Sequence, residues 1–262
     1  MREVISMWKN TRMVVLVALC AAIYAAVLIP FKIAIPLIPG FTEVRPANAL
    51  PVVFSLLFGP AAAWGSAFGN LIGDFFGTLG LGSLFGFIGN FLYGYLPYRV
   101  WRRLSREVPS LRSGGQVVQC AWVALLASGA CALVIGWGVD LLGLVPFAAL
   151  GNIILLNNFI VAAILSPILM RILYPRVEKW GLLYKDVLEE EELSEGRAPR
   201  SGHLLLWLAV VGGIVLGNVI SLGLYDAGFL AAGFTQGAKG ELGVGLGLLP
   251  CILLLVLGAL LI

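Results

Sequence analysis

Polar residues stand among long apolar runs, and their types suit binding better than catalysis. They are Glu43, Arg45, Asn48, Asn70, Asp74, Asn90, Tyr93, Asn152, Asn157 and Asn158. Amide side chains both donate and accept hydrogen bonds, and an arginine with a carboxylate adds one charge of each sign. Such a set suits a small polar ligand with mixed donors and acceptors, for example a heterocycle. Asn70 and Asp74 are four residues apart, which places both side chains on one face of a helix.

The usual sequence signatures of catalysis are missing. The single histidine, His203, cannot form a multi-histidine metal site, and the four cysteines form no C-x-x-C pair. The chain has no G-x-x-x-x-G-K-[ST] phosphate loop and no G-x-S-x-G nucleophile motif. We therefore predict no metal, no cofactor and no enzymatic activity, and we expect that ATP is not used by this chain itself.

The composition is that of a membrane protein. Of 262 residues, 60% are hydrophobic and 12% are charged, whereas soluble chains carry about a quarter charged residues. Crossing a hydrocarbon core of about 30 Å takes about 20 apolar residues of helix. We predict an all-α polytopic membrane bundle with spans at residues 13–35, 49–58, 61–76, 84–98, 117–137, 150–174, 204–224 and 242–262. The basic residues lie in short segments between these runs, so we expect the lipid bilayer and no nucleic acid as a partner.

The chain divides into three parts. We predict a six-helix substrate-binding module at 1–185, an acidic cytoplasmic linker at 186–202 and two additional transmembrane helices at 203–262. Lysine and arginine concentrate after the fourth and sixth spans, and such an excess marks cytoplasmic loops. This predicts a multi-pass protein of the plasma membrane with both termini in the cytoplasm, and it places three loops, 36–48, 77–83 and 138–149, outside.

With this orientation the polar set lies in the outer half of the bundle. A polar group in hydrocarbon is costly unless it faces a cavity or a partner, so the cluster predicts a pocket open to the outside. Trp64, Phe68, Phe87 and Tyr93 could provide stacking faces for a ring. Two plainer interpretations stay open: the amides serve as hydrogen-bond contacts between helices, or Asp74 pairs with Arg45 in a structural ion pair.

The first span carries a different pattern. Ala18, Ala22 and Ala26 repeat every four residues and form a face of small side chains, where another helix can approach closely. We predict a helical partner at this face, near the cytoplasmic side.

Longer motifs in the same region resemble a known family. LFGPAAAWG at 57–65, GNLIGD at 69–74 and GFIGN at 86–90 resemble the substrate-binding S components of energy-coupling factor (ECF) vitamin transporters. VRPANALP at 44–51 is most similar to the subfamily for queuosine-precursor uptake. The resemblance covers the six spans within residues 10–175.

The resemblance implies a six-helix module that captures a vitamin-like molecule with its first, third and fifth loops. Arg45, Asn70, Asp74 and Asn152 would hold the substrate. The face of Ala18 and Ala22 would dock on an ECF transmembrane scaffold subunit driven by two cytoplasmic ATPases. The acidic linker and the two C-terminal spans depart from the six-helix pattern, and the added spans could cover the docking face.

Two other functions remain open. A self-sufficient secondary transporter of a small polar metabolite could build ion sites from glycine-interrupted spans, although Asp74 is the main carboxylate within a span. An intramembrane aspartyl protease would pair Asp74 with Asp226, but the glycine spacing is incomplete and Asp226 falls in a predicted loop.

Overall fold

Helices build almost the whole of the described chain. The computed structural model describes residues 2–34, 36–38, 41–43, 45–105, 107–189, 193, 196, 198–224 and 241–262. The α-helices are α1 (Arg2–Ser6), α2 (Thr11–Ala34), α3 (Ala49–Phe58), α4 (Pro60–Asp74), α5 (Gly82–Leu104), α6 (Gly114–Leu141), α7 (Phe147–Lys179), α8 (Tyr184–Val187), α9 (Pro199–Ser221), α11 (Glu241–Gly247) and α12 (Leu249–Leu261). A short antiparallel pair, β1 (Pro36–Ile38) with β2 (Thr42–Glu43), follows α2, and 3₁₀ turns cover Met7–Lys9 and Pro46–Asn48.

Polar side chains cap the beginnings of α2 and α6. The Asn10 Oδ1 atom accepts hydrogen bonds from the backbone N–H groups of Arg12 and Met13 at 3.0 and 3.3 Å, and so caps α2. Ser113 caps α6 in the same way through the N–H of Gln116. The Asp140 carboxylate, near the end of α6, accepts the N–H of Phe147 at the start of α7 and so ties the two helices together.

The helices α3 and α4 form a tight hairpin at Gly59. This glycine has a φ of +54°, and a Cβ atom at this position would lie 2.7 Å from the Tyr184 ring, so both conformation and space require glycine. Every residue of α3 is buried. With 10 and 15 residues, α3 and α4 are about 15 and 22 Å long, shorter than a hydrocarbon core. Their surroundings are therefore largely protein.

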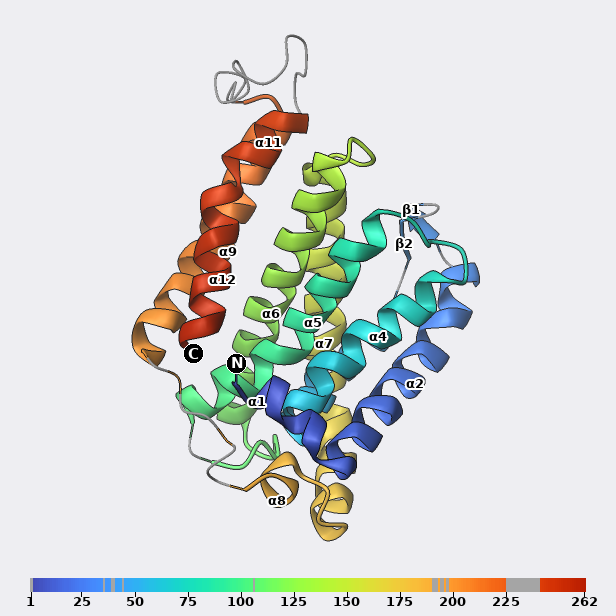
Figure 1. Cartoon of the computed structure of the whole chain (residues 1–262), viewed down its shortest axis with the longest axis vertical. Coiled ribbons are helices and arrows are strands. Elements are labelled where there is room, and N and C mark those ends of the chain that lie inside the picture. The colour runs from blue at the N-terminus through green and yellow to red at the C-terminus, as the bar shows by residue number, and fades with distance from the viewer. Residues whose placement is uncertain are drawn as a thin grey trace.

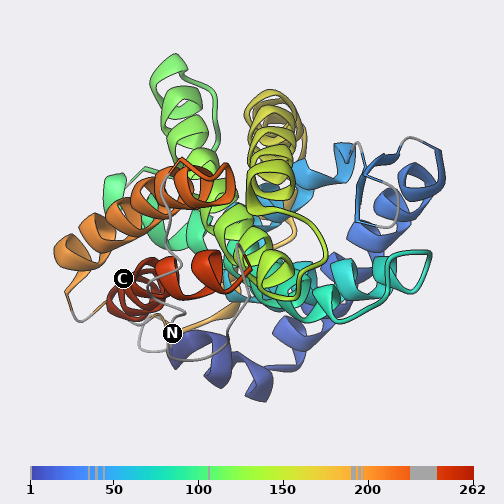
Figure 2. The same cartoon turned by 90° about the horizontal axis from the view of Figure 1, so that it is seen from above.

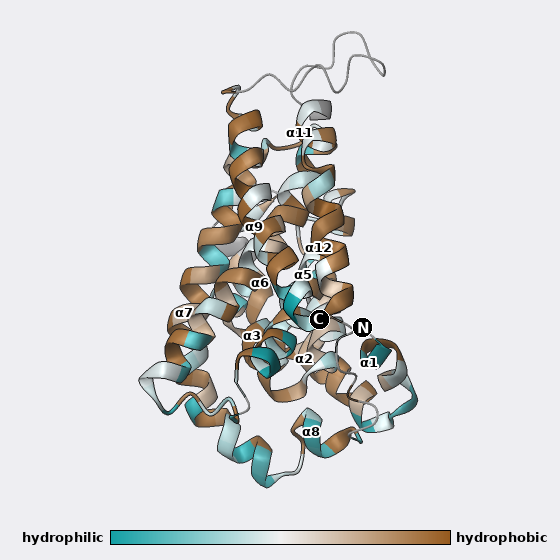
Figure 3. Cartoon of the chain, turned by 90° about the vertical axis from the view of Figure 1, so that its left-hand side faces the viewer, coloured by the Kyte–Doolittle hydropathy of each residue, from teal (hydrophilic) through white to brown (hydrophobic). Residues whose placement is uncertain are grey.

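The prediction of an all-α polytopic membrane bundle is confirmed. Within the described residues, four segments are long and apolar enough to cross a membrane: 11–31, 114–141, 147–187 and 199–221. Brown, apolar ribbon covers most of the bundle in Figure 3, whereas teal residues collect toward its lower end. The remaining predicted spans correspond to the shorter α3 and α4, to α5 with its three arginines, and to α11 and α12, which are separated at Leu248.

The C-terminal helices pack on one side of the bundle. The helices α9 and α12 lie against each other, and this pair contacts α6 and, through α9, also α7. The helix α2 packs on α4 at the other side, as Figures 1 and 2 show. Successive helices run up and down, so the segments that follow α2, α4 and α6 meet at one end of the bundle (Figure 1).

Helix ends deviate most from the sequence prediction where charged residues occur. The fourth span was expected at 84–98, but α5 continues through Arg99, Arg102 and Arg103 to Leu104. The expected linker 186–202 overlaps the start of α9 at Pro199. A helix does not end where the membrane does, because its backbone hydrogen bonds are satisfied internally in water as well.

Candidate functional site

A cavity of about 320 Å³ lies where the first, third and fifth connecting segments meet. Phe41 and Arg45 come from the first segment, residues 77–81 from the third and Leu144 from the fifth. The helices contribute Asn70, Asp74, Gly82, Ser83, Gly86, Asn90, Cys131, Ile135, Val139, Leu150, Ile154 and Asn158. Binding sites for small ligands have about this size or more.

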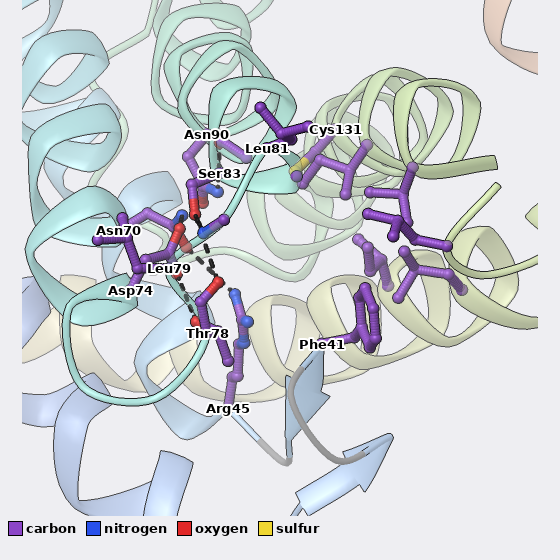
Figure 4. Close-up of a pocket in the computed structure, with 18 of the residues that line it drawn as sticks. Phe41, Arg45, Asn70, Asp74, Thr78, Leu79, Leu81, Ser83, Asn90 and Cys131 are labelled. Carbon is purple, nitrogen blue, oxygen red and sulfur yellow. Dashed lines mark hydrogen bonds between the residues drawn. The ribbon is translucent and has the colours of Figure 1, made fainter. Parts of the chain in front are cut away.

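One wall of the cavity is a chain of hydrogen bonds between charged and amide groups (Figure 4). The Arg45 Nη1 atom donates to Asn70 Oδ1 at 3.2 Å, and Asn70 Nδ2 donates to Asp74 Oδ2 at 3.2 Å. The hydroxyl of Thr78 donates to the other oxygen of Asp74 at 2.9 Å. Asn70 thus forms hydrogen bonds with a guanidinium and with a carboxylate, and both of these groups line the cavity.

Gly86 makes room for this wall. The helix α5 passes α4 at this glycine, and a Cβ atom there would lie 3.1 Å from Asn70 Nδ2 and 3.7 Å from Asp74 Oδ2. The first of these distances is tighter than an ordinary van der Waals contact. A larger residue at position 86 would therefore displace the amide that connects Arg45 with Asp74.

The opposite wall is apolar. Ile135 and Val139 line it from α6, and Leu150 and Ile154 line it from α7. Phe41 is placed near α7 in Figure 4, away from the polar wall. A planar ligand in such a cavity would find hydrogen-bond partners on one edge and apolar contact over its face.

Beneath the cavity lies a second, fully buried network. Asn48 Nδ2 donates to Asn158 Oδ1 at 2.5 Å, and the Tyr93 hydroxyl donates to the backbone carbonyls of Asn48 and Asn158 at 2.8 and 3.2 Å. The Tyr24 hydroxyl lies 3.3 and 3.2 Å from the Oδ1 atoms of Asn48 and Asn90. Asn48 and Tyr93 are therefore bonded within the protein and support the cavity from below.

Besides Asn48 and Tyr93, the predicted site residues Asn152 and Asn157 do not line this cavity. Asn152 faces Asn218 of α9, and their amides exchange hydrogen bonds of 2.6 and 3.1 Å. Asn157 Oδ1 accepts the backbone N–H of Arg45 at 3.5 Å, so it contacts the backbone that carries the guanidinium. Glu43 lies in β2, and its side chain is outside the described part of the structure.

Three of the four aromatic residues considered as stacking faces, Trp64, Phe68 and Phe87, pack on one another, and the fourth, Tyr93, belongs to the network beneath the cavity. The rings of Trp64 and Phe68 stack at 6.0 Å, and Phe68 meets Phe87 edge to face at 5.3 Å. The Trp64 indole N–H donates to the Val4 carbonyl of α1 at 2.7 Å. None of these three rings is among the cavity-lining residues of the described chain.

The alanine face of α2 is open. Ala18, Ala22 and Ala26 are exposed, together with the neighbouring Leu19 and Ile23. The C-terminal helices lie on the other side of the bundle and leave this face uncovered (Figure 2).

Several cavity residues were missed by reasoning from sequence. Phe41, Thr78 and Leu144 lie in connecting segments, where no helical periodicity indicates the direction of a side chain. Thr78 carried a weak signal, since it follows Asp74 by four residues. Within the described residues no group of three or more histidine, cysteine, aspartate or glutamate side chains could hold a metal ion.

Comparison with known proteins gave one family match. A family model described as QueT transporter matches residues 14–175, which begin in α2 and end in α7. Curated proteins and solved structures gave no match. The family match confirms the resemblance seen in the motifs and the prediction of a membrane transport component. The helices α9, α11 and α12 lie beyond the matched range. Because the match covers more than half of the chain, the protein belongs to the QueT transporter family, the ECF S components for queuosine-precursor uptake.

Proposed function

We propose that this chain captures a queuosine precursor, a 7-deazaguanine base, in the cavity between its first, third and fifth connecting segments. The observation that carries the proposal is the composition of the cavity: the Asp74 carboxylate, the Arg45 guanidinium and several amides face an apolar wall. The proposal takes the substrate class from the family and the binding groups from the geometry.

The hydrogen-bonding groups of a deazaguanine match this wall. Its pyrimidine edge offers adjacent N–H donors and one carbonyl acceptor. A carboxylate such as Asp74 only accepts hydrogen bonds, a guanidinium such as Arg45 only donates them, and the Asn158 amide does both. The side chains of Ile135 and Ile154 supply apolar contact for the ring. Hydrogen bonds to the charged groups would be the strong ones, because charge-assisted bonds exceed neutral ones.

The cavity opens to the outside in the proposed orientation. The connection between α5 and α6, and the segment after α7, lie at the end of the bundle away from the cavity (Figure 1). These two segments are flanked by most of the basic residues, and such loops face the cytoplasm. The N- and C-termini would then be cytoplasmic as well.

Transport would depend on partners. The sequence lacks a phosphate loop, so energy would come from two cytoplasmic ATPases coupled through an ECF transmembrane scaffold subunit. The exposed face of Ala18, Ala22 and Ala26 is the proposed contact for that scaffold. Small side chains allow close helix packing, which is a main source of association between helices in lipid.

Substrate binding can be tested on the purified full-length chain. Titration calorimetry with 7-aminomethyl-7-deazaguanine should give one site, and Asp74→Asn should weaken it about tenfold or more because a charge-assisted hydrogen bond is lost. Glu107→Gln makes the same chemical change at an exposed carboxylate outside the cavity and should leave affinity unchanged. Equal affinity of Asp74→Asn and the unaltered protein would remove Asp74 from the ligand contacts.

The secondary-transporter alternative calls for a separate measurement. The chain alone, reconstituted in liposomes under a sodium or proton gradient, should not accumulate the same base. Uptake should appear only when scaffold and ATPases are reconstituted with it and ATP is supplied. Gradient-driven accumulation by the lone chain would overturn the partner-dependent mechanism while leaving the binding site intact. Asp226, which the protease alternative requires, lies outside the described residues.

A further inference from the structure

A second cavity lies far from the first, between the C-terminal part of α5, α6 and the start of α9. It has a volume of about 380 Å³ and is lined by Val100, Leu104, Trp122, His203 and Trp207. The rings of Trp122 and Trp207 meet edge to face at 5.0 Å. We call this space the α9 groove. Two of its residues belong to α9, beyond the range that matches the family.

The α9 groove changes from apolar to basic along its length. Arg200, His203 and Trp207 are spaced by three and four residues, so they follow one face of α9. Trp207 lies about 10 Å along the helix from Arg200, toward the middle of the bundle. On α5 the order is reversed, since Val100 precedes Arg103 on a helix that runs the other way. Both helices thus place their cations at the same end of the groove.

This end also holds polar groups that can serve a ligand. His203 is half-buried, and its Nδ1 atom is buried with no hydrogen-bond partner among the described residues. Arg103 is exposed and close enough to His203 to act on it electrostatically. Arg200 is exposed as well. An unbonded buried nitrogen and two cations form a suitable setting for an anion.

The lipid-facing position of the groove indicates its occupant. Trp122 and Leu104 remain 55% and 47% exposed, so the groove is open at the surface of a membrane-embedded bundle. A phospholipid matches this change from apolar to basic groups, because its acyl chain lies toward the middle of the bilayer and its anionic phosphate lies at the edge. Basic pockets between helices at the cytoplasmic side are a known form of headgroup site.

We propose that the α9 groove binds one anionic phospholipid. The acyl chain lies along Trp122 and Trp207, and the phosphate is held by His203 with Arg103 and Arg200. The added helix α9 thereby gives the transport module a lipid site at the end opposite the substrate cavity. This proposal depends on membrane embedding and not on the identity of the substrate.

Native mass spectrometry of the full-length protein tests the proposal, with phosphatidylglycerol and phosphatidylcholine as probes. The unaltered protein should retain phosphatidylglycerol about tenfold more tightly than phosphatidylcholine, as expected for charge-assisted contacts. The double variant Arg103→Gln, Arg200→Gln should lose this preference. A matched double variant, Arg176→Gln with Lys179→Gln, removes two exposed cations of α7 and should keep it.

A second measurement locates the acyl chain. Phosphatidylglycerol with brominated acyl chains quenches nearby tryptophans, so quenching should drop when Trp122 and Trp207 are replaced by phenylalanine. Equal affinity for the two lipids overturns the proposal, as would be found if the groove instead receives a partner protein. A preference that survives in Arg103→Gln, Arg200→Gln, or that is lost equally in the α7 variant, overturns it too.

Discussion

Asn70 connects the two charged side chains at the edge of the proposed substrate cavity. Its carbonyl oxygen accepts from Arg45 and its amide nitrogen donates to Asp74, so one side chain orients both charges. The sequence interpretation had left open whether Arg45 and Asp74 form a purely structural pair. The structure shows that Asn70 bonds to both groups and that both line the cavity.

Gly86→Ala tests this arrangement at one atom. The added methyl group would crowd Asn70 Nδ2 at 3.1 Å, and a shift of the amide would misplace Asp74. We expect a loss of about 1 kcal/mol, or roughly fivefold in affinity for the deazaguanine probe, with the fold retained. Gly115→Ala is the matched control, because a Cβ at position 115 of α6 meets no other atom within 4 Å. Unaltered affinity of Gly86→Ala would mean that the amide is free to adjust.

The sequence predicts how deep each asparagine lies in the membrane, but it does not predict toward which neighbouring helix the side chain points. Asn152 and Asn158 are six residues apart on α7, which turns their side chains about 120° from each other. Asn158 reaches the cavity, whereas Asn152 reaches Asn218 of α9. Nothing in the sequence says which face of α7 meets the added helices. Asn152 and Asn158 are therefore equally good candidates for the site until the packing is known.

At the scale of elements, the first turns of α7 join the C-terminal helices to the proposed substrate cavity. The Ala148 N–H donates to the Ser221 hydroxyl at 3.1 Å, and Asn152 and Asn218 exchange hydrogen bonds. The Phe147 ring packs against Gly217, where a Cβ atom would overlap the ring. Leu144 and Leu150, on either side of this junction, line the cavity. The C-terminal helices therefore support one wall of the site.

Asn218→Ala should loosen this junction. It removes the hydrogen bonds with Asn152, which are worth about 0.6 kcal/mol each between membrane helices. We expect a lower melting temperature and an affinity for the deazaguanine reduced severalfold, because the apolar wall is less fixed. Leu216→Ala, at an exposed position of the same helix, should change neither quantity. If affinity stays constant while stability falls, the C-terminal helices do not act on the cavity.

The helix α1 is fixed at the opposite end by a buried carboxylate. Glu3 is 1% exposed, and it accepts hydrogen bonds from the Tyr98 hydroxyl at 2.7 Å and from Arg99 Nη1 at 2.8 Å. Glu3→Gln would take the counter-charge from the buried Arg99. Breaking one side of a buried pair costs about 3–5 kcal/mol, so thermal unfolding should move to clearly lower temperature. Glu107→Gln is an exposed control, and a stable Glu3→Gln protein would show that α1 is held by other contacts.

Helix boundaries were predicted best where the chain itself forces a turn. The second span was expected at 49–58 and α3 has these limits, because Gly59 with its positive φ and Pro60 end one helix and begin the next. The prediction was less accurate for α5, because the predicted span ends at residue 98, before the arginines, whereas the helix continues to Leu104. Arg99 can be buried in α5 because it pairs with Glu3, a contact between residues 96 positions apart that no local pattern reveals.

At the scale of the whole molecule, the sequence does not predict where the added C-terminal helices pack on the bundle. They could have covered the alanine face of α2, in which case docking on a scaffold would be blocked. Instead α9 and α12 pack on α6 and leave α2 at the other side (Figures 1 and 2). The side of the bundle on which an apolar helix pair packs depends on complementary surfaces, such as Gly129 against Val210 and Gly213 against Leu133. Hydrophobic periodicity alone does not identify such surfaces.

The open alanine face leads to a prediction about assembly. Ala22→Trp places a large ring at the middle of that face, where two helices could no longer approach closely. Co-purification with the ECF scaffold and ATPases, and uptake that depends on them, should fall at least tenfold, while the isolated chain should bind the deazaguanine as before. Val211→Trp introduces the same ring at an exposed position of α9, on the other side of the bundle, and should leave assembly intact. If Val211→Trp disrupts assembly and Ala22→Trp does not, the scaffold docks on the C-terminal helices, and the role proposed for α2 is wrong.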